Sequence, residues 1–169
     1  MSESSLMMLG TLKPLPPPQA IPLLLRFAER TDADAQRQAR ALTTAVIQNN
    51  MALRLKQSSQ EEEIILAVER FALRNLDSPT RSALLDGIGL AGSTDRNPRL
   101  TAIVVAGLRH SDANVRKRGL HNLMRLGQEE IRKASVDVER LRTQDPDAEV
   151  RAEADKALRV MGGESQFPR

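Results

Sequence analysis

The sequence predicts an all-α fold, specifically an α-solenoid of about four helical hairpins. Three segments, Asp77–Arg81, Asp112–Arg116 and Asp147–Arg151, align at a fixed offset of 35 residues. The residues that follow each arginine stay in register, and a glycine stands eleven positions after each one. Apolar residues recur at intervals of three and four, and no alternating strand pattern competes with them. A repeat of this length is typical of stacked helical hairpins.

Both ends of the chain are expected to lie outside the solenoid. Residues 1–19 contain four prolines between Lys13 and Pro18. Each proline removes a backbone donor and disfavours helix in the residue before it, so this segment is predicted to be an extended, proline-rich N-terminal arm. Residues 163–169 are expected to form a short C-terminal tail. The solenoid domain is therefore predicted to span residues 20–162.

The first hairpin, residues 20–60, is predicted to be a divergent repeat. Its two helices are expected at Ile21–Glu29 and from Ala33 to about Lys56. Asp32 fits the opening of the repeat, but Gln36 then stands at the arginine position, and the next repeat begins 45 residues later. Irregularity is expected of a terminal repeat because one of its sides faces water.

Three regular hairpins follow, at residues 61–92, 93–127 and 128–162. Each is expected to contain two helices joined by a turn, with proline and glycine marking helix ends. In the last hairpin, Ile131, Ala134, Val138 and Leu141 have the spacing of one continuous first helix. The predicted helix pairs are Glu61–Asn75 with Ser78–Ala91, Pro98–Leu108 with Ala113–Leu126, and a helix through Ile131–Leu141 with Ala148–Met161.

The repeated aspartate and arginine are predicted to be structural residues. Asp77, Asp112 and Asp147 stand where a helix begins, and an aspartate there accepts hydrogen bonds from free amides. The arginine four residues later, which is Arg81, Arg116 or Arg151, can pair with the same aspartate or with that of the next repeat, giving an Asp/Arg ladder. Small residues at Gly119 and Ala154 favour close helix packing. The glycines that end the repeats, Gly92, Gly127 and Gly162, suit the left-handed conformation of a helix C-terminus.

This pattern resembles the HEAT repeat, especially its short bacterial form found in phycobilisome-lyase-type proteins. The resemblance covers about residues 77–162, and Asp147–Gly162 carries nearly the full pattern, Asp-x-x-Val-Arg followed by a small residue, Ala-Leu and a closing glycine. The resemblance implies an α-solenoid whose second helices line a concave contact surface. The departures from the pattern are Gly119 and Asn122 in the third hairpin, and Thr80 and Gly87 in the second.

A candidate partner-binding surface follows from the repeat register. Positions two, five and nine after the arginine are expected to point outward from the second helices. In the third hairpin these positions are Arg118, His121 and Arg125, and Lys117 adds to their positive charge. An acidic patch on a protein partner is expected to meet this basic row. The flanking candidates are Asp86 in the second hairpin, and Glu153, Lys156 and Val160 in the fourth.

Excess apolar residues also favour a protein partner. The first helix of the second hairpin carries Ile65, Leu66 and Leu73 in addition to the stripe that its core needs. The N-terminal arm, a second copy of the chain or another protein could cover them.

Catalysis is not predicted. His110 and His121 are not spaced as a helical metal pair, and Glu61–Glu63 fits the positive end of a helix dipole. No phosphate-binding glycine-rich loop, nucleophile elbow or metal motif occurs in the sequence. The chain also lacks the paired His-Glu motifs of HEAT-like hydroxylases and the Trp and Tyr residues expected of HEAT-like glycosylases. A non-catalytic adaptor without cofactor or metal is therefore the main hypothesis.

Two other functions stay open. Nine basic residues lie between Arg96 and Lys133, so this segment could bind nucleic acid, although no Trp or Tyr is available for base stacking. The HEAT resemblance also leaves open a chromophore lyase or chaperone subunit of the phycobilisome-lyase type. The absence of cysteine, of a leader peptide and of a long apolar segment leads us to expect a cytoplasmic protein. The net charge is only +3, and the oligomeric state is left open.

Overall fold

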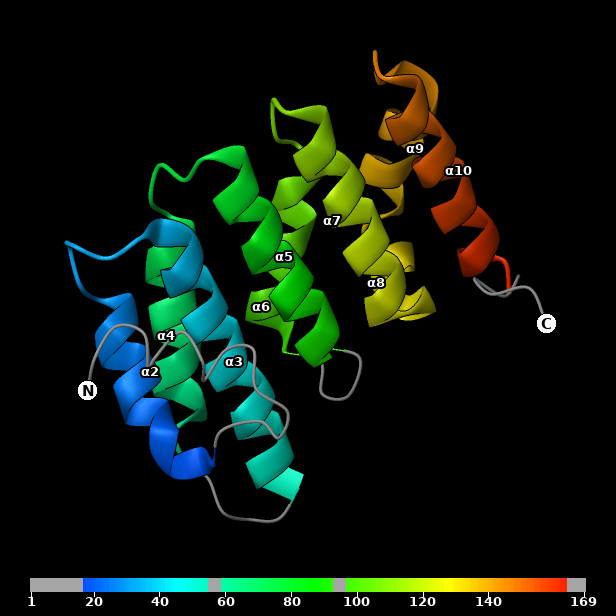
Figure 1. The fold of residues 1–169 in the computed structure, drawn as a ribbon. Coiled ribbons are helices and arrows are strands. Elements are labelled where there is room, and N and C mark those ends of the chain that lie inside the picture. Colours follow the sequence, from blue (N-terminus) through cyan, green and yellow to red (C-terminus); the bar gives the residue numbers. More distant parts are fainter. Residues whose placement is uncertain (1–16, 55–58, 93–96, 164–169) are drawn as a thin grey trace. The chain divides into compact units, whose positions relative to one another are not determined.

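A computed structural model describes residues 17–54, 59–92 and 97–163 of the chain (Figure 1). These residues form nine α-helices and one short 3₁₀ helix, and no strand occurs among them. The predicted all-α class is thereby confirmed. In the same residues, no helix combines the length and the apolar character that a membrane crossing requires. The chain divides into two compact units, Met1–Gly87 and Ile88–Arg169, which we call unit 1 and unit 2 and describe separately.

Unit 1 is a set of packed helices close to those predicted. α2 packs against α3, α3 packs against α4, and α2 also contacts α4. Leu24, Leu42, Ile64 and Val68 are essentially inaccessible to water and form part of the core that these contacts create. The elements of this unit are η1 (Pro18–Ala20), α2 (Ile21–Ala28), α3 (Ala35–Arg54), α4 (Glu61–Ala72) and the first part of α5 (Ser78–Gly92).

The predicted C-terminal boundary of the N-terminal arm overlaps the first helical turn of the structure. Pro17 is extended, but Pro18 opens the 3₁₀ helix η1, which leads directly into α2. Proline suits the first position of a helical turn because its φ is already fixed and its missing N–H has no helical acceptor. Residues 1–16 of the predicted arm lie outside the described residues.

The predicted register of the first repeat is wrong by two residues. Asp34, not Asp32, caps α3, because its Oδ1 accepts a hydrogen bond of 2.9 Å from the backbone N–H of Arg37. The arginine position of this repeat is therefore Gln38, four residues after Asp34. Gln38 is fully buried, and its Nε2 donates to the backbone oxygens of Phe27 and Arg30 at the end of α2. Asp32 instead pairs with Arg30.

Gly87 allows α5 to approach α3 closely. A Cβ atom added to Gly87 would lie 2.1 Å from both Cβ and Cγ2 of Thr43. Real Cβ atoms do not approach so closely, and the obstructing Cβ is fixed to the backbone of α3. Gly87 departs from the HEAT pattern, and the reason is that Thr43 on α3 leaves no room for a side chain at this position.

Unit 2 also consists of packed helices. α7 packs against α6, α8 and α10, and α10 packs against α8 and α9. Leu108, Leu120, Leu123 and Val150 are fully buried in its core. The elements are the end of α5, α6 (Pro98–Gly107), α7 (Ala113–Leu126), α8 (Gln128–Lys133), α9 (Ser135–Gln144) and α10 (Ala148–Met161).

The first helix of the fourth hairpin is divided, whereas the sequence predicts a continuous helix. Ala134, with φ of −94° and ψ of 10°, leaves the helical conformation between α8 and α9. The break lets α8 contact both α7 and α10, while α9 packs against α10. Ile131 and Val138 are both fully buried, so the apolar spacing is satisfied by two short helices as well as by one.

Small residues in unit 2 have the predicted packing role. A Cβ atom on Gly119 would lie 3.0 Å from Cδ2 of Leu108, so α7 lies close to the end of α6. Asn122, a departure from the HEAT pattern, is fully buried against Gly89, where an added Cβ would come within 2.2 Å of its Oδ1. The larger side chain of Asn122 is therefore accommodated by the glycine opposite.

The predicted glycine turns are only partly confirmed. Gly127 has a φ of 102° and separates α7 from α8. Gly162 has a φ of −74°, and the positive φ of 100° belongs to Gly163 instead. The helix α10 therefore makes its left-handed exit one residue later than expected.

Candidate functional site

The repeated aspartates cap their helices as predicted. Asp112 Oδ1 accepts a hydrogen bond of 2.7 Å from the N–H of Asn114. Asp147 Oδ1 accepts hydrogen bonds of 2.8 and 3.0 Å from the two amides that follow Ala148. Asp77 Oδ1 accepts a hydrogen bond of 2.8 Å from the N–H of Thr80, and hydrogen bonding with Thr80 lowers the pKa of the Asp77 carboxyl group. The three aspartates thus fix where α5, α7 and α10 begin.

The repeated arginines bind the loop that precedes their own helix. Arg81 donates to the backbone oxygens of Ala72 and Arg74. Arg151 donates from Nη1 to the oxygens of Asp145 and Pro146. These contacts with carbonyl groups, which the repeat pattern does not predict, tie each arginine to the turn of its own hairpin.

Arg116 makes a buried ion pair with Asp145, an acid outside the repeated Asp-x-x-x-Arg pattern. Its Nε and Nη2 donate to the two carboxylate oxygens of Asp145 at 2.7 and 2.8 Å. Its Nη1 donates to the backbone oxygens of His110 and Ser111. An ion pair of the predicted Asp/Arg ladder therefore links α7 to the loop before α10. Its acid is Asp145, however, two residues before the expected Asp147.

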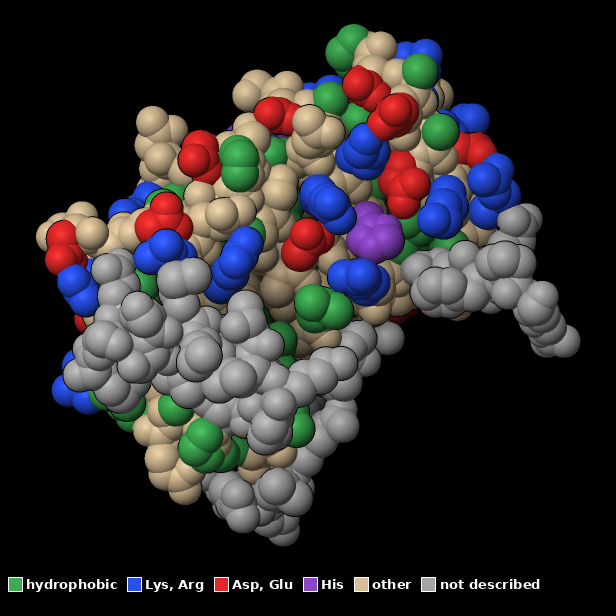
Figure 2. Space-filling model, viewed as in Figure 1, with side chains coloured by type: hydrophobic (Ala, Val, Ile, Leu, Met, Phe, Trp, Pro, Cys, Tyr) green, Lys and Arg blue, Asp and Glu red, His purple; other side chains and the backbone are tan. Residues whose placement is uncertain are grey.

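The candidate residues of unit 2 lie on two helices that pack together. We define the α7–α10 surface as Lys117, Arg118, His121 and Arg125 of α7 with Glu149, Glu153 and Lys156 of α10. Arg118 and Arg125 are exposed, and the other predicted members are intermediate in exposure. Figure 2 shows acidic and basic side chains interspersed over this part of the molecule. Val160, also predicted to point outward, is buried instead, with 7% of its surface exposed.

Acidic residues of α10 face the basic residues of α7. Lys117 pairs with Glu149, and the hydrogen bond that the lysine donates to this carboxylate raises the pKa of the lysine. His121 Nδ1 lies 3.7 Å from a carboxylate oxygen of Glu153, and Lys156 lies 3.8 Å from the same oxygen. The basic row on α7 therefore lies beside a row of mixed charge on α10, and acids of α10 pair with Lys117 and His121 of the basic row.

Arg125 differs from these paired residues. Its Nη1 donates to Oδ1 of Asn122 at 3.3 Å, and no carboxylate within the described ranges lies within 4.0 Å of its guanidinium. A neutral amide can orient a guanidinium without cancelling its charge. Asp86, the remaining predicted member, belongs to unit 1 and is not included in the α7–α10 surface.

The two histidines have separate surroundings. His110 Nδ1 accepts a hydrogen bond of 3.1 Å from the N–H of Asp112, whereas His121 faces Glu153 on α10. Within residues 17–54, 59–92 and 97–163, no group of three or more His, Cys, Asp or Glu residues is arranged to hold a metal ion. Glu61–Glu63 occupies the first turn of α4, as the dipole argument predicts.

The chain matches no protein-family model, no curated protein and no solved structure.

Proposed function

We propose that this chain is a non-catalytic HEAT-repeat adaptor that binds a protein partner through the α7–α10 surface. The main support is the exposure of Arg118 and Arg125, which are seven residues apart and therefore lie on the same face of α7. An acidic patch on the partner would meet these guanidinium groups. Such complementarity speeds encounter and sets the register more than it adds affinity.

Charge pairing favours a protein partner over nucleic acid. Among the described basic residues of the segment from Arg96 to Lys133, at least five already contact carboxylates. Phosphate groups approaching them would meet these acids and be repelled. A protein with acidic and basic residues of its own can instead complement a surface of mixed charge. The five pairs are Arg109–Asp137, Arg116–Asp145, Lys117–Glu149, Arg132–Glu129 and Lys133–Glu130.

The adaptor hypothesis also fits the exposed apolar residues of unit 1. Leu73 is 87% exposed and Leu66 is 39% exposed, whereas Ile65 is buried in the core. Leu66 and Leu73 are thus exposed for a second contact, whereas Ile65, which was also counted as an excess apolar residue, belongs to the core.

The proposal is tested by reversing the charge of both exposed arginines. The Arg118→Glu/Arg125→Glu variant and the wild-type chain are used to capture partners from native lysate, with and without nuclease and at two salt concentrations. The matched control is Arg26→Glu/Arg40→Glu, which makes the same charge change at two exposed residues of unit 1. Bound proteins are identified by mass spectrometry, and circular dichroism establishes that each variant retains its helicity.

We expect a defined protein to be captured by the wild type and by the control, but not by the α7 variant. Equal capture by all three chains would refute the assignment of this surface. Recovery dominated by nucleic acid, removed by nuclease and lost steeply with salt, would instead support the nucleic-acid alternative.

A further inference from the structure

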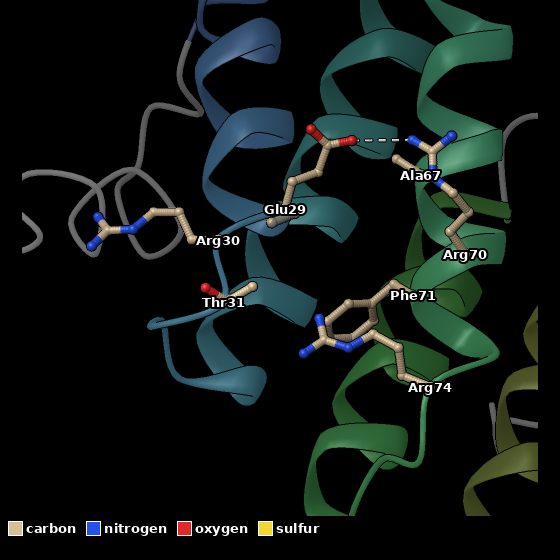
Figure 3. A pocket seen from close by; sticks show the side chains of 8 residues that line it. Glu29, Arg30, Thr31, Ala67, Arg70, Phe71 and Arg74 are labelled. Carbon is tan, nitrogen blue, oxygen red and sulfur yellow. Dashed lines mark hydrogen bonds and ion pairs between the residues drawn. The ribbon is translucent and has the colours of Figure 1, made fainter.

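Unit 1 contains a pocket between the end of α2 and the second half of α4, which we call the α2–α4 pocket. Its volume is about 340 Å³, and Figure 3 shows its lining side chains. Phe71 provides an apolar wall and is itself anchored in the core, with 3% of its surface exposed. The pocket is lined by Ala28, Glu29, Arg30, Thr31, Ala67, Arg70, Phe71 and Arg74.

Arg74 presents an oriented positive charge at this pocket. Its guanidinium carbon lies 4.8 Å from the centre of the Phe71 ring, over which it stacks. Its Nη1 donates a hydrogen bond of 3.1 Å to Oε1 of Gln38. Both neighbours are neutral, and in the described part of the chain no carboxylate lies within 4.0 Å of Arg74. Stacking and the amide contact therefore fix the guanidinium in advance and lower the entropy lost when a ligand binds.

Arg70 adds a second cation to the pocket, and its ion pair with Glu29 is weak. Its Nη2 lies 3.1 Å from Oε1 of Glu29, across the pocket, and both side chains are about 60% exposed. Such an exposed pair contributes little free energy, so an incoming carboxylate can compete with Glu29. Arg30 points away from Arg70 and Arg74 in Figure 3 and pairs with Asp32 at 2.6 and 2.8 Å.

The corresponding groove of unit 2 shows what distinguishes the α2–α4 pocket. That groove, of about 480 Å³, lies between α6 and the region around Ala134. Its Arg109 is held by both carboxylate oxygens of Asp137, and its Lys133 pairs with Glu130. Both cations are thus already matched with acids, whereas Arg74 contacts only neutral partners among the described residues of unit 1.

We propose that the α2–α4 pocket binds an aspartate or glutamate side chain from an acidic segment of a protein partner. The carboxylate contacts Arg74 and, after displacing Glu29, Arg70. The methylene groups of the ligand lie in the rest of the pocket, beside the small apolar surface that Ala67 and Phe71 expose there. A carboxylate is favoured over a phosphate dianion because α2 and α4 both end beside the pocket, and the negative ends of their dipoles oppose a double charge more strongly. This site is separate from the α7–α10 surface and does not depend on it.

The probe is a fluorescein-labelled peptide of alternating glutamate and alanine, and a glutamine-alanine peptide serves as the reference. Binding to the full chain is measured by fluorescence anisotropy at physiological salt, and the arginine Nε–Hε signals are followed by NMR. Arg74→Gln should weaken binding about tenfold through loss of a charge-assisted contact. Glu29→Gln should strengthen binding several-fold because the competing carboxylate is removed. Arg26→Gln, the matched control, removes an exposed arginine that does not line the pocket and should change binding less than twofold.

Three results would overturn the proposal: equal weakening by Arg26→Gln and Arg74→Gln, equal binding of the glutamine peptide, or tighter binding of a matched phosphoserine peptide. If Arg74→Gln does not fold, Arg74→Lys keeps the charge but loses the planar fork, and we expect an intermediate loss of affinity. Arg118→Glu/Arg125→Glu should bind the peptide through the pocket as the wild type does. Failure of the proposed α7–α10 surface would therefore be distinguishable from failure of this pocket.

Discussion

Replacing Asp145 with alanine is expected to lower the free energy of unfolding by about 3 kcal/mol, because it leaves Arg116 buried without its counterion. The Asp145 side chain is 2% exposed and that of Arg116 is 9% exposed. The substitution removes two charge-assisted hydrogen bonds, of 2.7 and 2.8 Å. Arg116 keeps its two bonds to backbone oxygens, which places the expected loss at the lower end of the range of about 3–5 kcal/mol for a broken buried pair.

Urea denaturation at pH 7, followed by circular dichroism, measures this loss. A double-mutant cycle with Arg116→Met isolates the pair. In the Arg116→Met background, Asp145→Ala should cost no more than about 1 kcal/mol, because it removes a 3.0 Å hydrogen bond from the N–H of Asp147 but also removes a buried carboxylate that has lost its counterion. A loss below about 1 kcal/mol in the wild-type background, or a coupling energy near zero, would show that desolvation cancels the attraction and would refute the reasoning.

The same pair predicts how stability depends on pH. Hydrogen bonds from Arg116 hold the pKa of Asp145 below its usual value. Because the folded pKa lies below the unfolded one, of about 3.9, the stabilisation is complete above the unfolded pKa and is lost as the pH falls through the folded pKa. The wild type should therefore lose stability more steeply than Asp145→Ala between about pH 5 and pH 2. Identical slopes would contradict this account.

Two further substitutions test the packing and the caps. Gly87→Ala should destabilise the protein by about 1–3 kcal/mol, measured by thermal or urea unfolding, because the new Cβ meets Thr43 at 2.1 Å. This loss is expected even though alanine has a higher helix propensity than glycine. A neutral or stabilising effect would contradict the close contact. Asp147→Ala should cost about 1 kcal/mol through loss of the N-cap of α10, and Asp147→Asn, which keeps an acceptor oxygen, should cost less; an equal cost for both would argue against a capping role.

Helix positions are predictable from this sequence because their signals are local. Pro98 opens α6 and Ala113–Leu126 is helical, both as predicted. The capping aspartates supply the start of each second helix, and a cap acts on the amides immediately after it. No distant contact is needed to place such boundaries, which explains their agreement with the structure.

The register of the first repeat could not be obtained in the same way. The helix α3 spans 20 residues, whereas α7 and α10 each span 14, so the 35-residue offset cannot be extended back through it. Asp32 and Asp34 are both suitable caps by residue type. Only the contacts of Gln38 with the end of α2 identify Asp34 as the equivalent of the later aspartates.

The partners of charged residues were the least predictable feature. Asp145 stands before a proline in a turn, where aspartate is common for local reasons, so nothing in the sequence marks it as the acid of a buried pair. Likewise, Glu149 and Glu153 follow the helical pattern of α10, but their positions opposite Lys117 and His121 depend on how α7 and α10 pack. Position in the repeat predicts which side chains share a helix face, but the charges of the neighbouring helix decide how basic that face is.

A difference at one repeat position connects the irregular first repeat with the proposed pocket. In unit 2, the second helix supplies the cation Arg116, and a following loop supplies the carboxylate of Asp145. In unit 1 the roles are reversed, because α3 supplies the neutral acceptor Gln38, and the turn after α4 supplies the cation Arg74. An amide oxygen orients a guanidinium but leaves its charge uncompensated. In unit 2 this arrangement forms the ion pair between Arg116 and Asp145. In unit 1 the related arrangement orients Arg74 beside a neutral amide, so a carboxylate from outside the chain can form the ion pair instead.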